Sequence, residues 1–157
     1  MYNPADMQIR KAKISDAKPI SALVNCYAEQ DRMLYRSLAD IYENLQNFFV
    51  AEENGDIIGC CALQVIWADL AEIKSLAVKT GEQGKGVGKA LIEAVVECVQ
   101  DLGVKKVFAL TLEKRFFEKS GFSEVDTNTL PMKVWSDCAR CPKQNSCDET
   151  AMVKELQ

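Results

Sequence analysis

The order of apolar and polar positions along the chain predicts a series of strands and helices. Apolar residues alternate with polar ones over residues 7–12, which indicates a short strand. After Ser15 and Asp16, which we expect to cap a helix, apolar residues recur three and four positions apart, and this spacing indicates an amphipathic helix. The spacing of Ser37 and Asp40 resembles a helix-capping arrangement and predicts the start of a second helix.

The middle of the chain predicts a hairpin followed by another strand. Apolar stretches over 48–52 and 57–67 flank the turn-forming residues 54–56, and a further apolar stretch covers 71–78. The elements expected after it are a helix over 87–102, a strand over 104–110, a short helix over 113–120, and strands through Val125 and over 132–135. This order of elements indicates the α/β class.

Length and composition limit the kinds of protein that this chain can be. With 157 residues, 48% of them hydrophobic, it is long enough for one domain that buries roughly two-thirds of its unfolded surface. A net charge of −4 without a long basic run argues against a nucleic-acid partner. No apolar run approaches the roughly 20 residues of a membrane span, and the first residues lack a signal peptide, so we expect a cytoplasmic protein with no membrane partner. Seven cysteines favour reduced thiols over a disulfide framework.

A glycine-rich segment, Gln83-Gly84-Lys85-Gly86-Val87-Gly88-Lys89, lies between a predicted strand and a predicted helix. Its alternate glycines leave backbone N–H groups uncovered at a helix N-terminus, which predicts a seat for a diphosphate. A P-loop would need glycine at Gln83 and a hydroxyl at Ala90, and a dinucleotide fingerprint would need Gly or Ala at Lys89 or Leu91. Both familiar loops are therefore excluded, and the plainest alternative is a glycine-rich turn before an ordinary helix.

The segment from Gln83 to Gly88 fits the pattern Arg/Gln-x-x-Gly-x-Gly and resembles the coenzyme A pyrophosphate loop of the GNAT acetyltransferases. Residues 71–78 and 116–122 resemble the strand before that loop and the later helix and turn of the same superfamily. Within it, the segments that resemble the N-acetylglutamate synthases are Ala71-Glu72, 34–37, 109–111, 130–135 and the tail 138–142. The resemblance implies a GNAT fold, with a mixed central sheet flanked by helices in a single domain over 1–137, and a cysteine-containing tail over 138–157 packed on the same domain.

The resemblance also implies acetyl-CoA as cosubstrate. The residues expected to bind it are Leu76, Ala77, Val78, Gln83, Gly84, Lys85, Gly86, Val87, Gly88, Lys89 and Phe117. A backbone N–H near 76–78 would hold the carbonyl oxygen of the acetyl group. Many GNAT enzymes protonate the departing thiolate with a tyrosine where this chain has Phe117. Either another donor serves, or the thiolate leaves unassisted, since a thiol pKa near 8.5 makes it a fair leaving group.

Acetyl transfer to an amine needs a base, because an amino acid carries an ammonium group at pH 7. The chain has no histidine. Glu72 is the leading candidate, because it stands in a mostly apolar strand where desolvation would raise its pKa. The resemblance gives Glu72 the same role, directly or through a water that Ser75 could order. The alternative is a carboxylate at the end of a strand that faces solvent.

The acceptor that the resemblance implies is the α-amine of L-glutamate, in arginine biosynthesis. Its two carboxylates call for Arg or Lys, so Arg36 is the first candidate and Lys133 the second. Most Arg and Lys side chains in proteins are solvated surface charges. The resembled family tends to place proline at the position of Tyr35, next to Arg36. Alternatives are an acetyltransferase for another amine, a polyamine or a protein N-terminus, a non-catalytic acetyl-CoA sensor, and a regulatory partner of a larger synthase. GNAT domains often pair, so a homodimer is also expected.

Three cysteines near the C-terminus follow the spacing Cys-x2-Cys-x5-Cys: Cys138, Cys141 and Cys147. A structural zinc would need a fourth ligand, from Cys26, Cys60 or Cys61. We expect no metal, because closed zinc sites usually have four protein ligands and no histidine is available. Cys60 and Cys61 are adjacent in a predicted strand, so at most one of them is expected to face the core.

Overall fold

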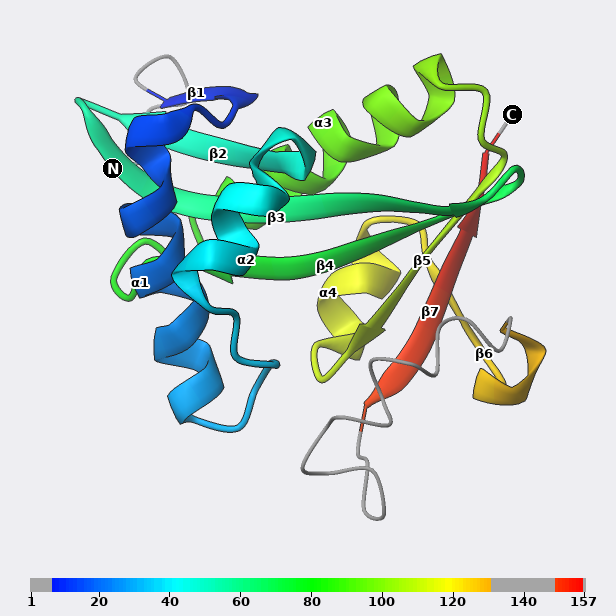
Figure 1. Cartoon of the computed structure of the whole chain (residues 1–157). Coiled ribbons are helices and arrows are strands. Elements are labelled where there is room, and N and C mark those ends of the chain that lie inside the picture. Colours follow the sequence, from blue (N-terminus) through cyan, green and yellow to red (C-terminus); the bar gives the residue numbers. More distant parts are fainter. Residues whose placement is uncertain (1–6, 131–148, 157) are drawn as a thin grey trace. The chain divides into compact units, whose positions relative to one another are not determined.

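The computed structural model describes residues 7–130 and 149–156 (Figure 1). Its elements in chain order, with η for short 3-10 helices, are β1 (Met7–Lys11), η2 (Ile14–Asp16), α1 (Ala17–Glu29), α2 (Leu38–Glu43), η3 (Leu45–Asn47), β2 (Phe48–Glu53), β3 (Asp56–Trp67), β4 (Leu70–Val78), α3 (Val87–Asp101), β5 (Lys106–Thr111), α4 (Lys114–Lys119), β6 (Ser123–Val125), η4 (Thr127–Thr129) and β7 (Thr150–Glu155).

Within the described residues, the strands form a seven-stranded sheet in the order β1-β2-β3-β4-β5-β7-β6. β1 pairs with β2 and β2 with β3 in antiparallel fashion, whereas β4 pairs with β5 in parallel through Ala71↔Val107 and Glu72↔Phe108. β7 is antiparallel to both β5 and β6. The predicted mixed sheet is therefore confirmed.

The chain forms two compact units, each with its own core. The first runs to Leu63 and resumes over Ile73–Cys98, and the second comprises Gln64–Glu72 and the chain from Val99 onward. In the second unit the core includes Phe108 and Ala151, on β5 and β7.

In the first unit, helices cover both faces of β3. On one face, Ile20 of α1 and Ile41 of α2 share a core with Cys60. On the other face α3 lies so close that a Cβ added to Gly59 would be 2.9 Å from Val87 Cγ1. Figure 1 shows α1 and α2 on one side of this strand and α3 on the other.

Because both faces of β3 are covered, Cys60 and Cys61 are both fully buried. The prediction that at most one of them faces the core was wrong. It assumed a sheet with one solvated face, whereas strands with helices on both faces have two buried faces.

The final strand, β7, was not predicted. Residues 150–155 were expected to belong to a tail, and the last strand was expected at 132–135, which lies outside the described residues. In β7 only Ala151 and Met152 are buried, and Lys154 and Glu155 follow them. So short an apolar stretch carries little periodicity, and its role as a strand depends on its partners β5 and β6.

The two predicted helix starts differ in outcome. Ser37 caps α2, since its hydroxyl accepts a hydrogen bond of 3.0 Å from the backbone N–H of Asp40. Ser15 lies inside η2, and the side chain of Asp16 makes no cap bond to α1. The Asp16 carboxylate instead accepts hydrogen bonds from the backbone N–H of Lys13 at 2.8 Å and from the Arg10 guanidinium at 2.7 and 3.1 Å.

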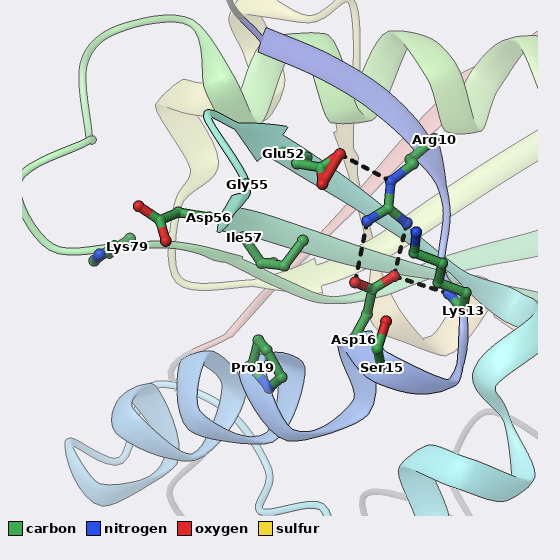
Figure 2. A pocket seen from close by; sticks show the side chains of 10 residues that line it. All are labelled: Arg10, Lys13, Ser15, Asp16, Pro19, Glu52, Gly55, Asp56, Ile57 and Lys79. Atoms are coloured by element: carbon green, nitrogen blue, oxygen red, sulfur yellow. Dashed lines mark hydrogen bonds and ion pairs between the residues drawn. The ribbon is translucent and has the colours of Figure 1, made fainter.

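Arg10 also pairs with Glu52 at 3.3 Å, which ties β1, β2 and the start of α1 together (Figure 2). These residues line a cavity of about 430 Å³ whose wall also includes Lys13, Asp56 and Lys79. Its wall contains three acidic and three basic side chains. Arg10 is paired with both Asp16 and Glu52, which indicates a structural role for these three residues.

Candidate active site

The centre of the candidate site is a distortion in β4 at Ser75. This residue has φ of +54° in the middle of a strand, a left-handed conformation that is uncommon for any residue other than glycine. Its carbonyl accepts a hydrogen bond from Cys60 Sγ at 3.5 Å, and its hydroxyl accepts one from Arg36 Nη1 at 3.2 Å. Residues held in rare backbone conformations cluster at functional sites, so this part of β4 is a candidate for one.

Arg36 lies just before α2, and Asp40 orients its guanidinium. The Asp40 carboxylate accepts hydrogen bonds from Arg36 Nε at 2.7 Å and from Nη2 at 3.4 Å. The Phe48 ring lies 5.1 Å from the guanidinium carbon. The hydrogen bond from Arg36 lowers the pKa of the Asp40 carboxyl and outweighs the opposing effect of burial, so Asp40 stays charged. The structure thus brings together Arg36 and Ser75, which were predicted separately.

Asn25 of α1 fixes the backbone of Arg36. Its Oδ1 accepts a hydrogen bond from the Arg36 backbone N–H at 3.1 Å, and its Nδ2 donates one to the Arg36 carbonyl at 2.9 Å. Neither Asn25 nor Asp40 was identified as a site residue from the sequence. A polar residue near a helix end is too common to single out, and only the fold shows what it contacts.

The glycine loop has the geometry of an anion seat. Gly84 and Gly86 have φ of +78° and +87°, and a Cβ at either position would meet no atom within 4 Å. Glycine is thus required there for its backbone conformation, which leaves the loop backbone uncovered. α3 begins at Val87, and the first N–H groups of a helix lack partners within the helix and carry the positive end of its dipole.

The residues predicted to bind coenzyme differ in which of their groups are exposed and could contact it. Lys85 and Lys89 are exposed on the loop, and Lys85 forms an ion pair of 3.3 Å with Glu82. Val87 and Ala77 are buried, so they can offer only backbone groups. Leu76, Val78 and Gly88 are half-buried. Their contact with coenzyme remains a prediction.

Tyr27, near the end of α1, connects β4 to the glycine loop. Its hydroxyl donates a hydrogen bond of 2.7 Å to the Val78 carbonyl and accepts one from the side-chain amide of Gln83. Tyr27 was not predicted as a site residue, because helical periodicity assigns it to the apolar face of the helix. The one available indication was the residue type, since a buried tyrosine usually finds a partner for its hydroxyl.

Glu72 belongs to the second unit and is 6% exposed, opposite Phe108 of β5. A carboxylate that faces solvent at the end of a strand is therefore excluded. Phe117 is 3% exposed, and its ring packs edge-on against Phe116 and Phe122 at 5.2 and 5.1 Å between centroids. Its side chain has a packing role, and its contact with coenzyme stays a prediction.

Some predicted residues lie outside the described part of the chain: Lys133, Cys138, Cys141 and Cys147. Within residues 7–130 and 149–156, no group of three His, Cys, Asp or Glu side chains is placed to hold a metal ion. No helix in the same ranges combines the length and the apolar character needed to cross a membrane.

The known proteins that resemble this chain are acetyltransferases. Residues 44–124 match the model of a family described as the acetyltransferase (GNAT) domain. An uncharacterized N-acetyltransferase of Chlorobaculum tepidum is 43% identical over 152 residues, which cover 97% of this chain and 98% of that protein. An amino-acid acetyltransferase of Mycobacterium tuberculosis is 36% identical over 135 residues, which cover 84% of this chain and 77% of that protein.

A solved structure of Neisseria gonorrhoeae N-acetylglutamate synthase, complexed with coenzyme A and N-acetyl-glutamate, is similar with a TM-score of 0.87 and 29% identity. The match covers 96% of this chain and 35% of that one, so this chain spans about a third of the synthase. A Mycobacterium tuberculosis structure in complex with CoA has a TM-score of 0.84 and 32% identity, and the match covers 96% of this chain and 99% of that one.

Proposed function

The chain belongs to the GNAT acetyltransferase family and is an acetyl-CoA-dependent amino-acid N-acetyltransferase, and we propose that its acceptor is the α-amine of L-glutamate. The proposal is supported by the similarity to a synthase complexed with coenzyme A and N-acetyl-glutamate. We place the activity in arginine biosynthesis in the cytoplasm, with a homodimer as the expected assembly.

The observation that carries the proposal is the orientation of Arg36. Among the described residues, its bonds to Asp40 and Ser75 use three of the five guanidinium N–H groups. The remaining donors can bind a carboxylate of the acceptor. The Arg36 side chain is 14% exposed, so it is partly desolvated and already ordered before the acceptor arrives. Such a guanidinium loses little conformational entropy on binding, which favours an acidic amino acid over a polyamine.

The coenzyme would bind through its diphosphate to the N–H groups of the glycine loop, and its pantetheine arm would run along residues 76–78 of β4. The α-ammonium first loses one proton, which we assign to Glu72, directly or through a water ordered by Ser75. The neutral amine then attacks the thioester carbonyl and the C–S bond breaks. The departing thiolate of coenzyme A takes up the second proton, which the nitrogen releases as the amide forms. A backbone N–H near Leu76 would stabilise the developing oxyanion.

The proposal is tested by incubating purified protein with acetyl-CoA and L-glutamate, other amino acids or polyamines. N-acetylated product is quantified by chromatography, because the seven cysteines would interfere with thiol reagents. Turnover confined to L-glutamate supports the proposal. Turnover of a different amine only, or coenzyme binding without turnover, would overturn it.

The role of Glu72 is tested in the same assay by Glu72→Gln, which keeps the shape of the side chain and removes its basicity. We expect kcat to fall by about 10² to 10⁴, the usual contribution of a general base, while the Kd of coenzyme A stays near the wild-type value. Glu97→Gln, at an exposed position of α3, is the matched control and should retain full activity. A Glu72→Gln variant with normal kcat would exclude Glu72 as the base.

A further inference from the structure

We propose that Asn25 and Tyr27 are positioning residues through which one helix, α1, holds both halves of the active site. Asn25 fixes the arginine that binds the acceptor, and Tyr27 fixes the loop that binds coenzyme. The inference rests on the proposed function for the identity of the acceptor and of the coenzyme. It adds two residues that act through Arg36 and through the glycine loop.

Asn25 replaces the regular structure that the acceptor segment lacks. Arg36 lies between α1 and α2, in a stretch that belongs to neither helix nor strand. Asn25 pairs with both its backbone N–H and its carbonyl, as a neighbouring strand would. A third bond, from Asn25 Nδ2 to Ser21 Oγ at 3.2 Å, holds the amide in place. The position of the Arg36 backbone therefore depends on this amide, whereas Asp40 and Ser75 orient its guanidinium.

Tyr27 holds the glycine loop in a corresponding way. Its hydroxyl bonds to Val78, the last residue of β4, and to Gln83, the first residue of the glycine loop. These two bonds close the base of the turn that leads from β4 into α3. The ring packs against the core of the first unit, so Tyr27→Phe removes only the hydroxyl.

The two residues are two positions apart on α1, and neighbours at that spacing point in different directions. One rigid helix can therefore reach the acceptor arginine with Asn25 and the coenzyme loop with Tyr27. The two contacts are independent hydrogen-bond sets on one support, so removing either should weaken the binding of one substrate and spare the other.

The test is a comparison of Asn25→Ala and Tyr27→Phe in steady-state kinetics and in equilibrium binding of coenzyme A. We expect Asn25→Ala to raise the KM for L-glutamate about tenfold and to leave the Kd of coenzyme A within about twofold. We expect Tyr27→Phe to raise the Kd of coenzyme A and the KM for acetyl-CoA about tenfold, and to spare the KM for L-glutamate. Such changes match the loss of one or two hydrogen bonds.

The controls are Tyr42→Phe, on the exposed side of α2, and Asn128→Ala, at an exposed position of η4. Both should behave as wild type. Each α1 variant could instead raise the KM for L-glutamate and the Kd of coenzyme A together, in proportion to a lowered Tm. In that case the two residues have only a structural role and the inference is wrong. Unchanged binding of coenzyme A in Tyr27→Phe would also refute it.

The coenzyme titration needs no acceptor, so it separates this inference from the proposed function. A wild-type protein that binds coenzyme A without acetylating L-glutamate would overturn the proposed function and the role of Asn25 with it. The role of Tyr27 would then be tested only by the ratio of the Kd of coenzyme A in Tyr27→Phe to that in the wild type.

Discussion

Arg36 shows how neighbouring side chains turn a surface-type residue into a binding group. Asp40 takes one edge of its guanidinium and Ser75 another N–H, while the Phe48 ring lies beside it. A lysine could keep the charge but has no planar fork, so it could not contact both partners and a carboxylate in the same geometry.

We therefore predict that Arg36→Lys raises the KM for L-glutamate more than about tenfold and changes the KM for acetyl-CoA little. Arg115→Lys, at an exposed position of α4, is the matched control and should leave both constants unchanged. Initial rates over a grid of the two substrates would measure this, and an unaltered KM for L-glutamate in Arg36→Lys would remove Arg36 from the acceptor site.

Asp16 is the clearest source of pH-dependent stability. Burial acts to raise the pKa of its carboxyl, but the hydrogen bonds from Arg10 and from the Lys13 backbone outweigh burial, and the pKa lies below its ordinary value of 3.8. A depressed carboxyl pKa stabilises the folded state at pH values above 3.8, and this contribution is lost as the pH falls through the lower pKa of the folded state.

We predict that Asp16→Asn lowers the free energy of unfolding at pH 7 by about 3 kcal/mol, because it leaves Arg10 without its main partner in a mostly buried position. The variant should also lose part of the acid-induced destabilisation. Urea denaturation between pH 3 and 7 measures both effects. Asp56→Asn, at an exposed position in the wall of the same cavity, should follow the wild-type curve.

At the scale of elements, the contact between β3 and α3 determines where the anion seat lies. Gly59 of β3 lets the helix approach so closely that a methyl group there would meet Val87 Cγ1 at 2.9 Å and Leu91 Cδ1 at 3.1 Å. Val87 is the first residue of α3. A displacement at this point therefore moves the N-terminal turn whose N–H groups would hold the coenzyme diphosphate.

We predict that Gly59→Ala costs about 1–3 kcal/mol of stability, the usual effect of overpacking a core, and weakens the binding of coenzyme A. The effect should be non-additive with Val87→Ala, which removes the atom that clashes. Thermal melts and coenzyme titrations of the two single variants and the double variant measure this. Full additivity would show that the strain does not arise at the Gly59–Val87 contact.

At the scale of the whole molecule, the last described strand completes the sheet. β7 pairs with β5 over Lys106–Thr111 and with β6 over Ser123–Val125, so it joins segments that are far apart in the sequence. Met152 at its centre is fully buried.

We predict that Met152→Ala destabilises the protein by about 2–5 kcal/mol, as large-to-small core substitutions do, and that Met152→Leu costs less than about 1.5 kcal/mol. Chemical denaturation of both variants is the measurement. A small effect of Met152→Ala would mean that β7 contributes little to the packing of this unit.

The sequence by itself determined the features that depend on neighbours along the chain. Hydrophobic periodicity located the helices and most strands to within a few residues, Ser37 marked a true helix start, and the glycine loop pointed to the family that the comparisons confirm. Within such short stretches, side-chain spacing reports directly on the local backbone geometry.

Tertiary structure alone decided the features that depend on distant parts of the chain. Arg36 meets Ser75 across 39 positions, and Tyr27 meets Val78 across 51 and Gln83 across 56. The burial of both Cys60 and Cys61 and the placing of β7 were settled in the same way. No local pattern encodes these contacts, because each is created by the packing of several elements, and a side chain acquires its partner only when that packing is complete.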